Sequence, residues 1–260
     1  MIEFAISTLM QLSQMKTEVQ FTLCDSKSSV YKKIENNDWK LKKKNYAYFI
    51  DNSQLQLYKN GIVIRSRAFP DKDDVQVVLK KNYPIADVNN PIDQSDSFED
   101  ELLNDDSLHS ETCEYDLHGF EKKVACKIEH HMSYKKFLEL LNEGDWKGLL
   151  NDEQKQALLD SNPNLKLDSE IKKQRLVFAG PFYDQNYIQN HNDEEISLGI
   201  TTYGENSEFV EASVRSKVSE ELKAQRKLQK VLVKQNMNLC ENQSTHLTEQ
   251  KLKAFFTAKP

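Results

Sequence analysis

Residues 48–67, YFIDNSQLQLYKNGIVIRSR, carry most of the information about the fold. The second half of this stretch alternates between apolar and charged or polar residues. Because side chains of a β-strand point alternately to its two faces, Arg65 and Arg67 share one face, and Ile62 and Ile64 lie on the other. The alternation therefore predicts a strand over residues 61–69 with one basic face.

The same alternation recurs along the chain, and no repeated strand–helix–strand pattern separates the segments that show it. This order is typical of an antiparallel sheet or barrel. We predict eight strands, at residues 18–24, 39–50, 61–69, 74–80, 123–131, 172–178, 195–203 and 208–214.

Several of these strands carry a row of charged or polar side chains on one face. Glu18 is followed by Gln20 and Thr22, and Lys127 shares a face with Glu129. One interpretation is the solvent-facing side of an open sheet. The other is a tunnel, in which enclosed charges must be paired, hydrated or bound to a ligand. The tunnel would give an α+β fold: a closed eight-stranded antiparallel β-barrel with flanking α-helices.

Helical segments fill the gaps between the strands. We predict one domain over residues 1–260, with an N-terminal helix at 1–16 and C-terminal helices within 216–260. No basic residue precedes Lys16, so the N-terminus does not resemble a signal peptide. The remaining helices are expected at residues 26–36, 133–142 and 152–160, and the two C-terminal ones at 216–234 and 247–256.

The formal net charge is −6, and the charge is unevenly distributed. Ten acidic residues lie within residues 92–116, and no Lys or Arg occurs between Lys81 and Lys122. Because like charges repel, residues 89–116 are predicted to form an acidic loop, either a solvated insertion or a lid that enters a basic tunnel. The overall acidity argues against nucleic-acid binding through a basic surface, leaving at most an RNA 5′ triphosphate end as a ligand.

The four cysteines form no CxxC pair, and their spacing from neighbouring histidines fits no common zinc motif. We therefore predict free thiols and a cytoplasmic location. No apolar run is long enough to cross a bilayer, so no membrane partner is expected.

The 48–67 block resembles the signature of the CYTH domain, found in the triphosphate tunnel metalloenzyme superfamily. That signature runs from a Tyr-x-Asp motif through a Leu-x-x-Leu turn to Gly-x-x-Leu-Arg-x-Arg. Weaker matches follow in the family's order at residues 77–80, 127–129, 173–175 and 248–256.

The resemblance implies a tunnel in which basic residues hold a triphosphate and glutamates hold Mg²⁺ or Mn²⁺. Arginine forms forked hydrogen bonds to phosphate oxygens, and hard divalent ions prefer carboxylate and phosphate oxygens. By their positions in the motifs, the implied phosphate-binding residues are Arg65, Arg67, Lys80, Lys127, Lys173 and Arg175, and the implied metal-binding residues are Glu18, Glu129 and Glu211.

The sequence departs from the family in its acidic motifs. The Glu-x-Glu-x-Lys motif is degenerate and reads EVQFT over residues 18–22, and His131 and Ser213 replace glutamates of two later strands. The matched tunnel charges, five basic against three acidic, favour polyanion binding over tight metal binding. Two functions therefore remain open. One is a metal-dependent triphosphate phosphohydrolase, and the other is a non-catalytic relative that binds a nucleotide, polyphosphate or acidic protein segment. No catalytic residue is assigned.

Overall fold

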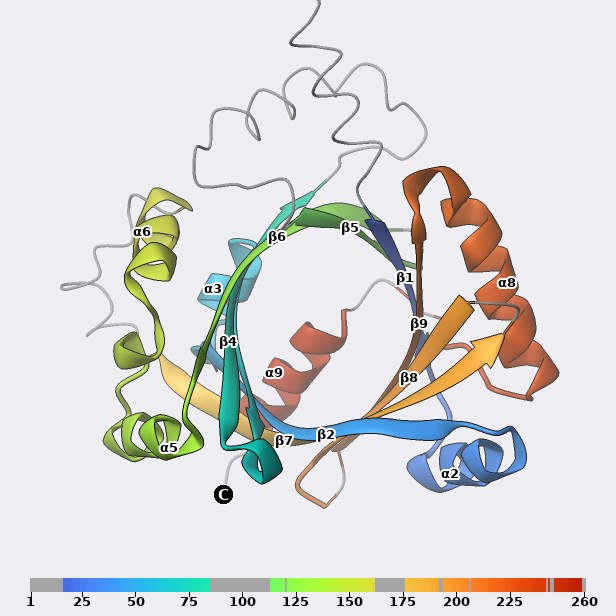
Figure 1. Ribbon diagram of the computed structural model, residues 1–260, viewed down its shortest axis with the longest axis horizontal. Coiled ribbons are helices and arrows are strands. Elements are labelled where there is room, and N and C mark those ends of the chain that lie inside the picture. Colours follow the sequence, from blue (N-terminus) through green and yellow to red (C-terminus); the bar gives the residue numbers. More distant parts are fainter. Residues whose placement is uncertain are drawn as a thin grey trace, which may run out of the picture.

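The computed structural model describes residues 16–84, 113–119, 121–161, 176–191, 194–205, 207–241, 243 and 246–258. Within these residues, strands close into a barrel in the order β1-β5-β6-β4-β3-β2-β7-β8-β9 (Figure 1). The strands are β1 Lys16–Leu23, β2 Lys40–Asp51, β3 Ile62–Phe69, β4 Asp74–Pro84, β5 Cys113–His118, β6 Glu121–Met132, β7 Val177–His191, β8 Glu194–Tyr203 and β9 Ser207–Lys217.

A closed barrel with flanking helices confirms the predicted architecture, but the number and direction of the strands differ. The barrel has nine strands rather than eight, and it is mixed because β1 and β5 are parallel, with Thr17 opposite Tyr115. The additional strand β5 comes from the end of the predicted acidic loop. That prediction is therefore wrong for residues 113–116, and residues 89–112 lie outside the described residues.

Other boundaries also shift. The strand expected at residues 172–178 begins at Val177 and continues to His191, through Gly180 and Pro181, which usually interrupt a strand. The helix expected from residue 216 begins at Glu221, because β9 extends further than predicted and a short 3₁₀ turn follows it. Residues 1–15 of the predicted N-terminal helix lie outside the described residues, and β1 begins at residue 16.

Helices cover the outside of the barrel in two groups (Figure 1). α2 (Lys27–Asn36) and α8 (Glu221–Lys234) pack on β1, β8 and β9, while α5 (Tyr134–Glu143) and α6 (Asp152–Ser161) pack on β3, β4 and β6. The apolar rows of the strands face these helices. Ile62 and Ile64 of β3, for example, are buried beside Phe137 and Leu158. The charged rows therefore face the interior, as the tunnel interpretation predicts.

The connection between β2 and β3 sets the start of the basic strand. It contains the short helix α3 (Gln56–Lys59). Asp51 is buried, and its carboxylate accepts hydrogen bonds of 2.8–3.1 Å from the backbone N–H groups of Asn52, Leu57 and Tyr58. Gly61 follows at φ +73°, where a Cβ would lie 2.6 Å from a carbonyl oxygen of β4. Both residues fix where β3 begins, and hence which of its side chains point inward.

All four cysteines form disulfides, Cys24 with Cys240 and Cys113 with Cys126, so the prediction of free thiols is wrong. Cys113 and Cys126 lie opposite each other in β5 and β6. Disulfides are typical of an oxidising compartment, so the cysteines no longer support the predicted cytoplasmic location. Among the helices of the described residues, none has both the length and the apolar character needed to cross a membrane.

Candidate functional site

A cavity of about 540 Å³ lies within the barrel and is lined by residues of all nine strands. The C-terminal helix α9 (Leu247–Thr257) lies across the barrel and is visible through the ring of strands in Figure 1. Leu252 of α9 belongs to an apolar cluster with Phe49 and Phe182. Lys251 and residues 246–248, by contrast, line the cavity. The helix therefore packs on apolar groups and adds polar ones to the cavity wall.

Charged side chains dominate this wall. Nine are basic and seven acidic, against five and three in the count based on motifs. The additional charges come from β2, β5, β6, β7, β8, β9 and α9. Apart from Lys251, which lies within the match at residues 248–256, they are at positions that match no motif. The basic residues are Lys42, Lys43, Arg65, Arg67, Lys80, Lys123, Lys127, Arg215 and Lys251, and the acidic ones are Glu18, Glu114, Asp116, Asp184, Glu194, Glu195 and Glu211.

Six of the nine predicted site residues line the cavity: Arg65, Arg67, Lys80, Lys127, Glu18 and Glu211. Glu129 is not among the lining residues. It shares a face of β6 with Lys127, whose Nζ lies 3.4 Å from its carboxylate, and it accepts a 3.2 Å hydrogen bond from Gln76. Its side chain is 40% exposed. Lys173 and Arg175 lie outside the described residues.

Carboxylates already neutralise five of the nine basic groups in the wall. Lys80 Nζ lies 2.5 Å from Asp116 Oδ2, and Lys251 Nζ lies 3.1 Å from Asp184 Oδ1. Asp184 also accepts a 2.5 Å hydrogen bond from Thr201. The other pairs are Lys42 with Glu195, Lys127 with Glu129, and Arg215 with both Glu18 and Glu114.

The other four cations, Lys43, Arg65, Arg67 and Lys123, have no carboxylate oxygen within 4.0 Å among the described residues. Burial, assisted by the charge of Arg67, lowers the pKa of Arg65 to about 9. Burial likewise lowers the pKa of Lys123 to about 8. The Lys43 side chain lies at the exposed edge of the cavity, but partial burial of its ammonium group, with the charges of Arg67 and Arg65, also lowers its pKa to about 8. Nε of Arg65 is buried and has no hydrogen-bond partner in the described part of the chain. The cavity therefore holds cations whose counter-charge has to come from a ligand or from solvent.

Three carboxylates meet where β1 lies beside β5. One oxygen each of Glu18, Glu114 and Asp116 lies within 4.8 Å of the others. Burial and the neighbouring Glu18 raise the pKa of Glu114. Burial acts in the same direction on Asp116, but Lys80 outweighs it and holds the pKa of Asp116 below its usual value. Only Glu18 was predicted. The signal for the other two was the alternating Glu-x-Asp-x-His row of residues 114–118, which begins at the end of the predicted acidic loop.

Glu211 is not one of these three carboxylates. Its Oε2 lies 4.0 Å from Nε2 of His118, a fully buried histidine whose Nε2 is also 3.0 Å from the hydroxyl of Thr22. Burial and the charge of Glu18 raise the pKa of Glu211 to about 7. Burial lowers the pKa of His118, so its ring is neutral near pH 7. Glu211 is thus a proton-exchanging group in the cavity wall at neutral pH.

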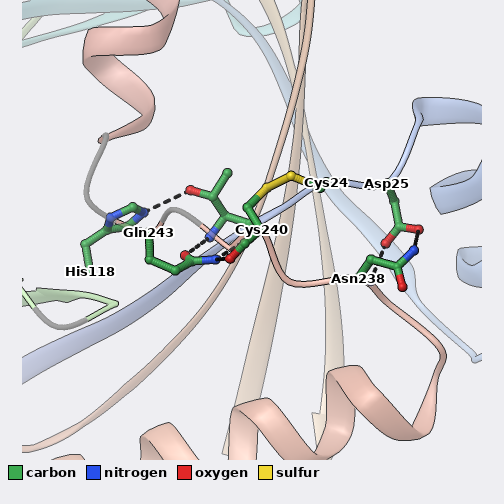
Figure 2. The surroundings of a disulfide bond; sticks show 7 residues. Cys24, Asp25, His118, Asn238, Cys240 and Gln243 are labelled. Atoms are coloured by element: carbon green, nitrogen blue, oxygen red, sulfur yellow. Dashed lines mark hydrogen bonds between the residues drawn. A yellow bond between two sulfur atoms is a disulfide. The ribbon is translucent and has the colours of Figure 1, made fainter.

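The segment that leads into α9 is fixed to the end of β1, as Figure 2 shows around the Cys24–Cys240 disulfide. Asp25 accepts hydrogen bonds of 2.7 and 3.0 Å from the backbone and side chain of Asn238. Three residues after Cys240, Gln243 exchanges hydrogen bonds of 2.8 and 2.9 Å with the backbone of β1. These contacts hold the start of α9 against the barrel.

Comparison with known proteins identifies the fold. No protein-family profile matches the chain, and no curated protein does. Among solved structures, HpAC1 from Hippeastrum, a candidate adenylyl cyclase described as having a dominant triphosphatase activity, is 14% identical, with a TM-score of 0.58 over 94% of this chain and 96% of its own. A candidate adenylate cyclase from Bacillus halodurans is 15% identical, with a TM-score of 0.53 over 88% and 96%. The chain therefore shares the fold of these two proteins. The CYTH-like fold expected from residues 48–67 is therefore confirmed.

Within this tunnel fold, the distribution of charge suits a ligand that is itself an anion. The acidic groups are mostly paired with cations of the wall, whereas Arg65, Arg67 and Lys123 are not. An enclosed wall of this kind attracts anions and strengthens their hydrogen bonds, because little water competes for the donors.

Proposed function

We propose that this chain binds a triphosphate-type polyanion inside its tunnel. The observation that carries the proposal is the enclosed pair Arg65 and Arg67. Both face the cavity from one strand, and neither has a carboxylate within ion-pair distance among the described residues. Arg67 makes one 3.4 Å hydrogen bond to Gln76, which supplies no charge.

The energetics favour an anion at this position. An enclosed cation without a partner loses solvation, which is why burial lowers the pKa values of both Arg65 and Arg67. A phosphate group that accepts hydrogen bonds from the two guanidinium groups restores the lost interaction. Each hydrogen bond to a charged group contributes roughly 1.5–3 kcal/mol.

We further propose that Mg²⁺ or Mn²⁺ accompanies the polyanion at Glu18, Glu114 and Asp116. Their spacing and hard oxygen atoms fit such an ion. Lys80 and Arg215, however, already contact these carboxylates. The ion therefore binds mainly when phosphate oxygens complete its coordination. Glu211 and Glu129 remain predicted metal-side carboxylates, although neither belongs to this cluster.

Hydrolysis of the bound triphosphate is the finer part of the proposal. The triphosphatase activity described for HpAC1 favours a triphosphate phosphohydrolase. Gln20 and Ser213 favour the alternative, a non-catalytic binder, because they line the cavity where the family motifs have carboxylates. We propose a polyanion-binding protein with slow or absent hydrolysis.

Calorimetry with inorganic tripolyphosphate, with and without Mg²⁺ or Mn²⁺, tests the proposal. Arg65→Ala should weaken binding by tenfold or more both with and without metal, since the arginine acts on phosphate directly. Lys81→Ala is the matched control, because Lys81 is on the outer face of β4 and donates to the carbonyl oxygen of Asn60. No binding by the wild-type protein, or equal effects of the two substitutions, would refute the proposal. Phosphate release under the same conditions separates the hydrolase from the binder.

A further inference from the structure

The Cys24–Cys240 disulfide joins the end of β1 to the chain that connects α8 to α9 (Figure 2). Helix α8 covers the outside of the barrel, whereas α9 lies across it (Figure 1). The disulfide is the one covalent attachment of this connection to β1, because the other two cysteines are bonded to each other. It therefore fixes the base of α9 to the tunnel wall.

The hydrogen bonds beside the disulfide belong to a very short strand-like pairing. The backbone N–H of Cys24 donates to the carbonyl oxygen of Asn238 at 2.9 Å, and that of Cys240 donates to the carbonyl oxygen of Thr22 at 3.1 Å. A single β-bridge joins the residues that precede the two cysteines. Water can replace each of these hydrogen bonds when the pairing opens, so their net contribution is modest. The covalent bond thus adds substantially to the attachment of α9.

This disulfide is also the more accessible of the two. Cys24 is exposed and Cys240 is half-buried, whereas Cys126 of the other disulfide is 2% exposed. In thiol–disulfide exchange a thiolate attacks one sulfur atom, so the rate depends on access to that atom. A dissolved dithiol can therefore reach Cys24 in the folded protein, while Cys126 is shielded.

The position of α9 affects the anion site through Lys251. The Nζ of this lysine lies 3.1 Å from Oδ1 of Asp184 and neutralises it. Burial lowers the pKa values of Arg65 and Arg67, and the charge of Asp184 acts on both in the opposite direction. If α9 leaves the wall, Asp184 loses its lysine and its full charge acts on the two arginines. It then competes with a bound anion for them.

We propose that Cys24–Cys240 is a site of thiol–disulfide exchange with a dithiol reductant, and that opening this bond lowers the affinity of the tunnel for polyanions. A thiolate of the reductant attacks Sγ of Cys24, the S–S bond breaks, and Cys240 leaves as a thiolate that takes up a proton. The second thiol of the reductant then displaces Cys24 as a thiol. Two electrons and two protons pass to the protein, and the reductant becomes a cyclic disulfide.

Non-covalent contacts alone then hold α9, so the helix opens more often and Lys251 releases Asp184. This inference rests on the proposed polyanion-binding function, to which it adds control by redox state.

The test measures the affinity for tripolyphosphate without metal by calorimetry, before and after mild treatment with dithiothreitol. Alkylation and mass spectrometry should identify Cys24 and Cys240 as the reduced cysteines, and the affinity should fall at least fivefold. The double variant Cys24→Ala with Cys240→Ala should have the lower affinity without treatment and should not respond to dithiothreitol. Cys113→Ala with Cys126→Ala, the matched control, should respond as the wild-type protein does.

Asp184→Asn separates this mechanism from a general loss of stability. The amide carries no charge to compete for the arginines, so reduction should change the affinity of this variant less than twofold although the same bond opens. An unchanged affinity of the reduced wild-type protein, or an equal fall in Asp184→Asn, would overturn the inference.

Amide exchange gives a second readout, which needs no ligand. Reduction should accelerate exchange in α9 at least tenfold, and α9 should then exchange at least tenfold faster than β3. Equal rates for α9 and β3, or unfolding of the reduced protein, would show that the bond holds the whole barrel and would overturn the inference. Absence of tripolyphosphate binding in both redox states would instead refute the proposed function, and amide exchange would still decide whether the bond controls α9.

Discussion

The two disulfides should contribute unequally to stability, because they close loops of very different length. Cys24 and Cys240 are 216 residues apart, whereas Cys113 and Cys126 are 13 apart. Loop-closure entropy of the unfolded chain gives about 5 kcal/mol for the long loop and about 3 kcal/mol for the short one at 25 °C. Whole domains are commonly stable by roughly 5–15 kcal/mol, so the loss of the long-range bond should leave little stability.

Urea unfolding of two double variants measures these contributions. Cys24→Ala with Cys240→Ala should lower the free energy of unfolding by about 2 kcal/mol more than Cys113→Ala with Cys126→Ala. Alanine is preferable to serine because Cys126 is 2% exposed, and a buried hydroxyl would add its own cost. A mild reductant should open the Cys24–Cys240 bond first, since Cys24 is exposed and Cys126 is not.

Thiol titration of the unfolded, unreduced protein provides the decisive control. The structure predicts no titratable thiol, because all four cysteines are bonded. Four thiols would show that neither bond forms and would refute the stability argument at its first step. A larger loss of stability for the Cys113–Cys126 pair would refute the loop-length reasoning even if both bonds form.

Three other predictions concern the lysines of the cavity wall, the ion pair that holds α9 and the buried aspartate before β3. Tripolyphosphate affinity should fall as pH rises from 7 to 9, by roughly tenfold for each lysine that must be recharged, because the pKa values of Lys43 and Lys123 are about 8. The stability of the free protein should change with pH in the opposite direction. Keeping these lysines charged destabilises the folded state below about pH 8, and this cost disappears as pH rises towards 10.5. The double variant Lys43→Met with Lys123→Met should lose both pH dependences. Lys251→Met should accelerate amide exchange in α9 several-fold because Asp184 loses its partner, whereas Lys253→Met, which breaks only the exposed pair with Glu249, should not. Asp51→Ala should lower the free energy of unfolding by about 2–4 kcal/mol, since three backbone N–H groups lose their acceptor, and an equal loss from the exposed Asp71→Ala would contradict this.

Strand periodicity predicted which side chains of several strands share a face, and the resemblance of residues 48–67 predicted that the strands close into a barrel. The prediction was correct for Arg65, Arg67, Lys80 and Lys127 because each has at least one apolar neighbour that belongs to the helix-covered outer cluster, namely Ile64, Ala68, Leu79 and Ile128. The reasoning is local: two residues of spacing determine which side chains share a face. The same locality explains the confirmed polar interior of β1, where Glu18 and Gln20 line the cavity.

The missed features depend on contacts between distant parts of the chain. In the sequence, the charges of Glu114 and Asp116 continue a repulsive acidic tract, which favours a loop. In the structure, Arg215 of β9 and Lys80 of β4 neutralise them, and β5 can therefore be a strand inside the barrel. The Cys24–Cys240 disulfide was missed for a similar reason, since 216 residues separate its two cysteines.

Strand β5, which was not predicted, also bears on whether the degenerate motif can still hold a metal ion. Within β1, Gln20 replaces a motif glutamate, so the carboxylate next to Glu18 is missing. The neighbouring strand β5, however, places one carboxylate oxygen each of Glu114 and Asp116 within 4.8 Å of one of Glu18. The Cys113–Cys126 bond fixes the start of β5 to β6 and so holds both carboxylates at the wall. We infer that the capacity of this tunnel for a divalent ion depends on the new strand and not on the motif. Glu114→Gln should then weaken metal-dependent tripolyphosphate binding as strongly as Glu18→Gln, and metal-free binding much less. If only Glu18→Gln weakened metal-dependent binding, the metal would be held by the motif glutamate and not by the carboxylates of β5.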